Sequence, residues 1–405
     1  MTELELHIDV MGRRGEGIAH HQDRTVFVPR ALPGEDLRAA GDGDRLRIVA
    51  IGTPSPDRVA PFCKHYERCG GCQLQHWREE PYRLWKADLV EQQLAGRGIG
   101  TKVSTLIDAH GTGRRRVSIH ARRKEGVVTA GFMEARSHVL LDIDRCPILV
   151  PALSRAFDIA RGLAAKLGDC DVALTATDTG IDASVKAERK VLQQEHAKLA
   201  SLIADLSLAR LSVNGELMGT AATPRLLMGK ANVSVPPGGF LQATAEGEAV
   251  LAQLVMDGVG RSKQVADLFC GIGPFAFRLA ERGKVEAFDN DRAAIAALNA
   301  AAKSTPGLKP VIGAVRDLFR EPVVANEMKA YDAVVFDPPR AGAEAQARQL
   351  AKSKVKTVVA VSCDAASFAR DAAILIEGGY RLTKLTAVDQ FKWSSHVEVV
   401  GVFQR

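Results

Sequence analysis

The sequence predicts an α/β protein whose C-terminal part forms a Rossmann-like parallel sheet, preceded by a small OB-like β-barrel and an α+β region that carries a cysteine cluster. Three observations predict this fold. Val358–Ser362 is a mostly β-branched run suited to a buried parallel strand, and an amphipathic helical pattern follows over Phe368–Ile376. Val265–Ala280 has the pattern of a strand, a glycine turn and a helix. Short strands separated by glycine-rich turns fill the beginning of the chain. We therefore expect three units, residues 1–55, 56–235 and 236–405.

Composition indicates a globular chain of two or three domains. Of 405 residues, 46% are hydrophobic and 25% charged, and no apolar run approaches the roughly 18 residues of a membrane span. The first residues lack the basic start and apolar core of a signal peptide, so we expect a cytoplasmic protein. Residues 1–50 hold 7 Lys and Arg against 9 Asp and Glu, whereas residues 51–150 hold 16 against 11. The basic excess in the second segment favours an anionic partner.

The first unit contains short strands such as Leu4–Val10, Thr25–Val28 and Leu46–Gly52. Strands at this spacing are typical of an OB-like barrel. Such barrels often bind nucleic acid, but the acidic balance of this unit argues against a strong hold on phosphate. Contact between this unit and RNA therefore stays open.

Four of the seven cysteines form a candidate metal site. Cys63, Cys69 and Cys72 are separated by five and two residues, and Cys146, followed by proline, supplies a fourth thiol. Zinc and a 4Fe-4S cluster both accept four thiolates, and the five-residue loop favours the larger cluster. Because the fourth cysteine closes the site, we expect a structural or RNA-shaping role and not redox chemistry. Four unrelated buried thiols are the alternative.

A helix is expected from Tyr82 to Leu94, and strands over residues 114–143. The run Arg114–Lys124 is rich in arginine. Basic side chains on one face of a sheet next to the cysteines would suit a phosphate backbone, and a solvated sheet face is an equal alternative. Cys170 is expected in the core.

The glycine turn of the C-terminal unit indicates a nucleotide-binding edge. Gly271 and Gly273 let the backbone pass close to a ligand, and Asp289 ends the second strand, where a carboxylate can bind ribose hydroxyls. The pattern Gly271-x-Gly273-x-x-Ala276 also fits a dinucleotide fingerprint, so it does not by itself identify the cofactor.

Three further features favour S-adenosyl-L-methionine (SAM). Asp267 lies inside the first motif, where it can pair with the charged amino group of this cofactor. Asp317 follows the third strand, where an acid can reach the adenine amine. Asp337-Pro-Pro-Arg340 closes the fourth strand and forms a rigid wall beside the methyl donor. Enzymes that methylate exocyclic amines follow this motif with an aromatic residue, whereas this chain has Arg340.

Cys363 is the candidate nucleophile. It follows a strand and precedes a helix, so it lies at the ligand-binding edge, where a helix N-terminus lowers the pKa of a thiol. A buried structural cysteine is the alternative, and Cys270 is a rival whose place in the glycine motif directs it to the cofactor. Glu398 precedes the last apolar strand. If that strand is the usual antiparallel neighbour, Glu398 reaches the same edge and can act as a general base.

Taken together, these motifs resemble the RNA uracil-5 methyltransferase family, in particular its iron–sulfur-containing ribosomal RNA branch. The resemblance covers nearly the whole chain, through Cys63, Cys69, Cys72 and Cys146, Phe240-Leu-Gln242, Asp267–Gly273, Asp337–Arg340, Ser362-Cys363 and His396-Val-Glu398. It implies an N-terminal TRAM module, a 4Fe-4S cluster on the four cysteines, and SAM bound by Gln242, Asp289, Asp317 and Asp337. It also implies that Asp337 and Arg340 orient a uracil.

The expected product is 5-methyluridine in ribosomal RNA, and the resemblance points to 23S rRNA. The reaction is expected to proceed through a covalent bond between Cys363 and uracil C6. The target has to be unstacked, so a single-stranded loop or bulge is favoured, and we expect a monomer without a membrane partner. Asp364 stands where the family usually has Asn, Phe391-Lys-Trp-Ser replaces a Phe-Pro-His-Thr-like turn, and Ala-Thr follows Gln242 where an Asn is common. A tRNA uracil-5 methyltransferase and a cytosine-5 RNA methyltransferase are the alternatives.

Overall fold

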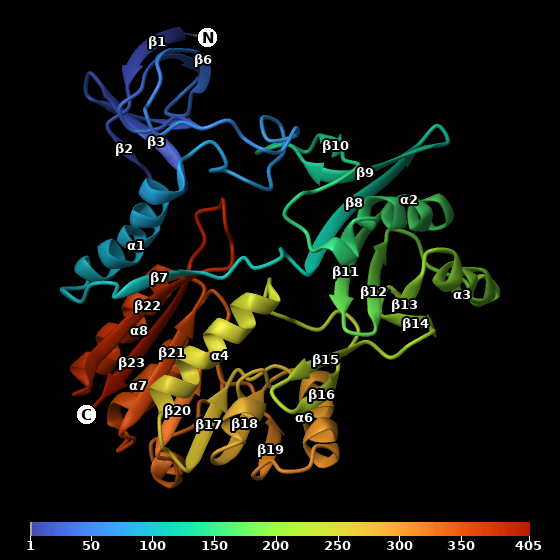
Figure 1. Cartoon of the computed structure of the whole chain (residues 1–405), viewed down its shortest axis with the longest axis vertical. Coiled ribbons are helices and arrows are strands. Elements are labelled where there is room, and N and C mark those ends of the chain that lie inside the picture. The colour runs from blue at the N-terminus through green and yellow to red at the C-terminus, as the bar shows by residue number, and fades with distance from the viewer. Residues whose placement is uncertain (1) are drawn as a thin grey trace.

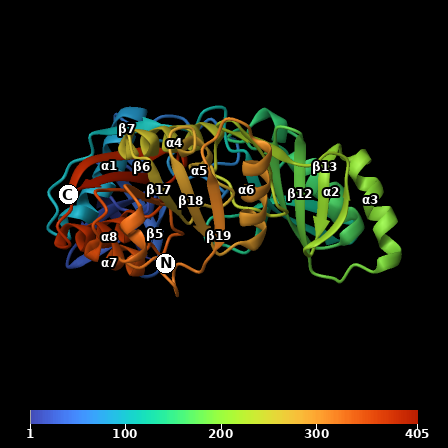
Figure 2. The same cartoon turned by 90° about the horizontal axis from the view of Figure 1, so that it is seen from below.

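The computed structural model describes residues 2–405 and arranges them as an N-terminal β unit, a central α+β unit and a C-terminal α/β unit (Figure 1). Seen from below, the central and C-terminal units lie side by side and give the molecule an elongated shape (Figure 2). Within residues 2–405, no helix is long and apolar enough to cross a membrane.

The N-terminal unit consists of two three-stranded antiparallel sheets around one apolar core. Leu6, Val26 and Val28 are among the buried core residues. The sheets have the orders β1-β5-β6 and β2-β3-β4, with β1 (Thr2–His7), β2 (Val10–Met11), β3 (Glu16–His21), β4 (Arg24–Pro29), β5 (Asp36–Gly41) and β6 (Arg47–Thr53). A strand-rich first unit is thus confirmed, whereas its assignment as a TRAM barrel stays a prediction.

The central unit is a seven-stranded sheet in the order β10-β9-β8-β11-β12-β13-β14, covered on one face by two helices. Cys170 lies in its core, as expected, and is 1% exposed. The elements are β8 (Arg116–Lys124), β9 (Val127–Met133), β10 (Leu140–Asp142), η1 (Pro151–Leu153), α2 (Ala156–Leu167), β11 (Cys170–Thr177), β12 (Gly180–Ala187), η2 (Gln193–Glu195), α3 (His196–Asp205), β13 (Leu208–Val213) and β14 (Glu216–Thr220).

The C-terminal unit is an eight-stranded sheet in the order β19-β18-β17-β20-β21-β23-β22-β7. A hairpin of β15 (Arg225–Met228) and β16 (Ala231–Ser234) precedes it. Its elements are α4 (Ala245–Val259), β17 (Gln264–Leu268), α5 (Ala276–Leu279), β18 (Lys284–Asp289), α6 (Arg292–Ser304), β19 (Val311–Val315), η3 (Glu327–Ala330), β20 (Ala333–Phe336), α7 (Glu344–Lys352), β21 (Thr357–Ser362), α8 (Ala365–Glu377), β22 (Arg381–Asp389) and β23 (Glu398–Gln404).

Helices cover both faces of this sheet, so its central strands are apolar on both sides. In β21, Val359 and Val361 belong to the core under α4 and α6, while Val358 and Ala360 belong to the core under α7 and α8. Successive side chains of a strand point to opposite faces, which explains why an unbroken apolar run fits this position. The Rossmann-like α/β fold predicted for this part of the chain is present.

One segment of the expected central unit lies elsewhere. Helix α1 (Glu79–Ala95) packs against α8, and β7 (Thr105–Asp108) pairs in parallel with β22 at the edge of the C-terminal sheet. In Figure 1, β7 runs beside β22 although the two are far apart in the sequence. Residues 79–108 therefore belong in part to the C-terminal unit, so the three units are not three consecutive ranges of the sequence.

Candidate active site

The carboxyl ends of the parallel strands bring the predicted catalytic side chains to one edge of the C-terminal sheet. Asp337 follows β20 and Cys363 follows the neighbouring β21. Strand β23 runs antiparallel to β21, with Val399 opposite Ser362, so Glu398 at its start lies at the same edge. The antiparallel arrangement expected for the last strand is confirmed.

These side chains line one cavity of about 560 Å³, which falls within the usual range for small-molecule sites. Seven of the predicted site residues line it: Gln242, Gly271, Asp289, Asp337, Arg340, Cys363 and Glu398.

The Cys363 thiol differs from the prediction in its acidity. Burial raises its pKa to about 12, and the nearby Glu398 and Asp337 carboxylates add to the rise, while the Arg340 guanidinium opposes it. The expectation of a pKa lowered by the helix N-terminus is therefore wrong. Burial of the thiol and the two carboxylates therefore outweigh the effect of the helix N-terminus, whose first free amides donate to the Asp364 carboxylate at 3.0 and 2.8 Å.

The two carboxyls of the cavity also have raised pKa values. Burial is the main cause for both Glu398 and Asp337, and their mutual repulsion raises the pKa of Glu398 further. Hydrogen bonds oppose the rise: Gln242 Nε2 donates to Asp337 at 3.0 Å, and Gln390 Nε2 donates to Glu398 Oε1 at 2.9 Å. Two carboxyls with raised pKa values beside a thiol are suited to moving protons near neutral pH.

Cys270 lines the same cavity but faces different groups. Its pKa is raised by burial and then by Asp267 and Asp289, which are on the glycine-turn side. Cys363 instead lies among Glu398, Asp337 and Arg340. The two thiols therefore occupy different parts of the cavity, and only Cys363 is near the proposed base.

The glycine turn and Asp289 are joined directly. The Gly271 amide donates to Asp289 Oδ2 at 2.8 Å, and the Asp291 amide donates to Oδ1 at 2.9 Å. Gly271 and Gly273 have φ of 53° and 93°, a region that side chains disfavour. A Cβ at Gly273 would also lie 2.9 Å from Leu298 Cδ1.

Three predicted cofactor residues are not among the lining residues of the cavity. Asp267 is fully buried, neither of its carboxylate oxygens has a hydrogen-bond partner, and burial raises its pKa well above the ordinary value. Gly273 is buried in the glycine turn and does not reach the surface of the cavity. The Asp317 carboxylate accepts from the Phe319 and Arg320 amides at 3.0 and 3.3 Å. Cofactor contacts by these residues stay predictions.

Several lining residues were not singled out from the sequence. Phe269, Leu318 and Phe319 form an apolar part of the cavity near Asp289, and the rings of Phe269 and Phe319 are 5.4 Å apart. An apolar slot beside a strand-end carboxylate fits an adenosine with its ribose, so the residues present fit SAM. Phe319 is two residues after Asp317, so the motif that predicted Asp317 as a cofactor residue could also have indicated Phe319.

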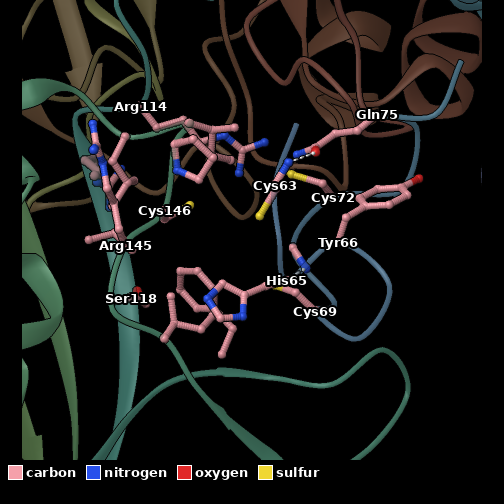
Figure 3. Close-up of a pocket in the computed structure, with 18 residues that line it drawn as sticks. Cys63, His65, Tyr66, Cys69, Cys72, Gln75, Arg114, Ser118, Arg145 and Cys146 are labelled. Carbon is pink, nitrogen blue, oxygen red and sulfur yellow. Dashed lines mark hydrogen bonds between the residues drawn. The ribbon is translucent and has the colours of Figure 1, made fainter. Parts of the chain in front are cut away.

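A second cavity of about 210 Å³ contains the four clustered cysteines (Figure 3). Cys63 and Cys72 come from the knuckle after the N-terminal unit, and Cys146 faces them from the central unit. The pKa values of Cys72 and Cys146 are raised to about 11 and about 12, by burial first and then by the other thiols of the set. The four side chains therefore share one electrostatic environment.

The cysteine cavity does not form a compact single-ion site. In residues 2–405, no three His, Cys, Asp or Glu side chains come together closely enough to hold a metal ion. Four thiols around a larger space have the chemistry to ligate a cluster, but a bound 4Fe-4S cluster is not supported by this geometry alone. It stays a prediction.

A mostly parallel sheet covered on both faces, with a glycine turn, a strand-end acid and a cavity of cofactor size, is typical of Rossmann-like enzymes that bind a nucleoside-containing cofactor, the class to which SAM-dependent methyltransferases belong. Residues 234–405 match the family described as tRNA (Uracil-5-)-methyltransferase. The chain is 45% identical to an uncharacterized RNA methyltransferase of Brucella suis biovar 1, with 99% of this chain and 98% of that protein covered. It is 31% identical to the 23S rRNA (uracil(1939)-C(5))-methyltransferase RlmD of Shewanella piezotolerans, with 100% and 96% covered.

The fold has a close counterpart among solved structures. The tRNA (uracil-54, C5)-methyltransferase of Pyrococcus abyssi, crystallised with S-adenosyl-L-homocysteine, superimposes with a TM-score of 0.78 at 22% identity, covering 98% of this chain and 99% of that one. The chain belongs to the RNA uracil-5 methyltransferase family, whose members are SAM-dependent enzymes.

Proposed function

We propose that the protein methylates C5 of a uridine in ribosomal RNA, in 23S rRNA by likeness to RlmD, through a covalent adduct on Cys363. The observation that carries this proposal is the cavity in which a thiol, Glu398, Asp337 and Arg340 lie beside the glycine turn. A tRNA substrate is the second candidate, because the Pyrococcus abyssi enzyme of the same fold acts on tRNA.

SAM, when bound, would supply an electrophilic methyl group to uracil C5 and be left as S-adenosyl-L-homocysteine. Uracil C5 is a weak nucleophile, and addition of the Cys363 thiolate to C6 makes C5 carbanion-like. The Sγ–C6 bond forms while the electrons of the C5–C6 double bond move towards C5 and O4. Arg340 stabilises the negative charge that develops there, and Asp337 orients the ring.

Restoring the aromatic base requires a proton acceptor. Glu398 removes the proton from C5, the C5–C6 double bond re-forms, and the Sγ–C6 bond breaks to release the thiolate. Because the pKa of Cys363 is raised in the free protein, its thiolate has to form by loss of the thiol proton to solvent, which leaves Glu398 ionised for the C5 proton, and a neighbouring positive charge would favour this step.

The test separates the two catalytic residues by step. Cys363→Ala should abolish both methylation and covalent RNA adduct, whereas Glu398→Gln should add and methylate but retain the RNA on Cys363 as a band that survives denaturing electrophoresis. RNA containing 5-fluorouridine should trap the wild-type enzyme in the same way, since fluorine cannot leave as a proton does. Cys270→Ala is the matched control and should keep Cys363 as the trapped residue. Methylation by Cys363→Ala would refute the assignment.

The substrate is tested separately. Mass-spectrometric mapping of ribosomal and transfer RNA from a deletion strain should show loss of one 5-methyluridine from 23S rRNA. Loss from tRNA would support the second candidate.

We also propose that Cys63, Cys69, Cys72 and Cys146 hold a 4Fe-4S cluster with a structural or RNA-shaping role. The shared cavity and the mutual influence of the thiols support this proposal. Anaerobically purified protein should be brown and contain about four irons per chain. Stoichiometric zinc in colourless, active protein would contradict it.

A further inference from the structure

A buried glutamine lies between the two carboxyls of the active site. Gln390 follows the end of β22 and is 0% exposed. Its Nε2 donates to Glu398 Oε1 at 2.9 Å and to Gln242 Oε1 at 2.7 Å, and its Oε1 accepts from the Ala243 amide at 3.0 Å. With the amide reversed, Oε1 would face two oxygen atoms, so the surroundings specify one orientation.

The second amide extends this contact to Asp337. Gln242 Nε2 donates to Asp337 Oδ2 at 3.0 Å. One hydrogen-bonded chain therefore links Glu398, Gln390, Gln242 and Asp337. A buried polar chain with each amide satisfied is rigid, because an unpaired group in this position costs free energy.

The two oxygens of Glu398 differ. Oε1 is bonded to Gln390, whereas Oε2 is buried without a hydrogen-bond partner. We propose that Gln390 is a positioning residue for Glu398: it holds Oε1 and so directs Oε2 to accept the C5 proton. This inference rests on the proposed function of Glu398, to which it adds a residue that orients the base.

The start of α4 leaves space for the Gln390 amide. A Cβ at Gly247 would lie 2.6 Å from Gln390 Oε1 and 2.9 Å from its Cβ. Gly247 is in an ordinary helix and does not line the active-site cavity. The same Cβ would lie 2.8 Å from Oγ1 of Thr244, the N-cap residue of α4, so Gly247→Ala displaces the Gln390 amide and crowds this cap while changing no residue that lines the cavity.

The test measures two steps in each of two variants. Gln390→Met keeps the size of the side chain and removes its hydrogen bonds. It should lower the rate of repeated methylation by about 10–100-fold, a part of the full contribution of a general base. Trapping of 5-fluorouridine RNA by Cys363, which does not require Glu398 to remove a proton from C5, should stay within about 2-fold of the wild-type rate. With ordinary RNA, the methylated adduct should accumulate.

The pH profile gives a further readout. Gln390 lowers the pKa of Glu398 against burial and Asp337, with Arg340 acting in the same direction as Gln390. Removal of the Gln390 amide should therefore raise the pKa of Glu398 and move the acidic limb of the turnover profile to higher pH. The Cys363 thiol faces the same carboxylate, but its titration governs addition and is followed by the trapping rate.

Gly247→Ala should reproduce the slow turnover, the normal trapping and the accumulated adduct. Gln253→Met on the exposed face of α4 and Gly100→Ala, where an added Cβ meets nothing within 4 Å, are the matched controls and should behave as wild type. Urea midpoints of all four variants report their folding.

Equal losses in trapping and turnover, or wild-type turnover in a folded Gln390→Met, would overturn the inference. Failure of the wild-type enzyme to trap 5-fluorouridine RNA would instead refute the proposed function.

Discussion

The buried Lys86–Asp389 pair should be one of the main contacts that hold the active-site loop. Lys86, on α1, is 0% exposed and Asp389 is 2% exposed. Besides this ion pair, Lys86 Nζ donates to the His396 carbonyl at 2.7 Å. Burial lowers the pKa of Lys86 to about 8 although Asp389 favours its charged form. The loop between these two acceptors carries Gln390 and leads into Glu398.

Lys86→Met removes the ammonium and leaves the Asp389 carboxylate with the Tyr82 hydroxyl, which donates at 2.6 Å, as its remaining side-chain partner. Breaking one partner of a buried pair costs about 3–5 kcal/mol, so we expect a loss of this size in the free energy of unfolding. The double variant Lys86→Met/Asp389→Asn should cost at least about 1 kcal/mol less than the sum of the two single variants, because it leaves no unpaired charge.

Urea unfolding followed by tryptophan fluorescence suits this measurement. The three tryptophans, Trp77, Trp85 and Trp393, all lie in this region, and the Trp393 amide donates to the Tyr82 hydroxyl at 3.0 Å. Lys102→Met, at an exposed ion pair with Glu91, is the matched control and should keep the wild-type midpoint. A loss below about 1 kcal/mol, or additive single effects, would refute the reasoning.

Three other results are expected. Asp289→Ala should weaken SAM binding by about 1–3 kcal/mol in calorimetry, the scale of a hydrogen bond to a charged group, and preferential binding of NAD would contradict the cofactor assignment. Turnover should rise with pH through about 8, the raised pKa of Glu398, which has to be ionised to accept a proton, and should still be rising above it because the Cys363 thiol, with a pKa of about 12, has to lose one; a profile that falls over this range would count against both roles. His76 is buried with its pKa lowered to about 3. Since the unfolded chain binds its proton near pH 6.5, stability should fall by up to about 1.4 kcal/mol per pH unit below that value, and His76→Gln should reduce this slope in urea unfolding; an unchanged slope would show that other groups control it.

The edge of the C-terminal sheet could be predicted because its signals are local. Strands β20 and β21 are short apolar runs followed by Asp337 and Cys363, β18 ends in Asp289, and parallel strands place their carboxyl ends together. Cys363, Asp337 and Glu398 therefore lie in one cavity, as the order of motifs indicated.

The remaining features depend on contacts between distant parts of the chain. The Gln390 amide that bonds to Glu398 is also held by Gln242, which is 148 positions away. The acidity of Cys363 depends first on its burial and then on two carboxylates from other strands, Glu398 and Asp337. No local pattern carries that information, and the helix start alone pointed in the wrong direction.

The pairing of β7 with β22 has a consequence for synthesis of the chain. Ser104 Oγ, just before β7, donates to the Leu385 carbonyl, across 281 positions of sequence. The α1–β7 segment therefore leaves the ribosome well before the strand that completes it exists. Because domains generally fold from the N-terminus during synthesis, the apolar residues of this segment that pack on the C-terminal unit, Val90, Leu94 and Leu106, stay uncovered until nearly the whole chain has been made. The enzyme can close its last sheet edge only after translation of β22.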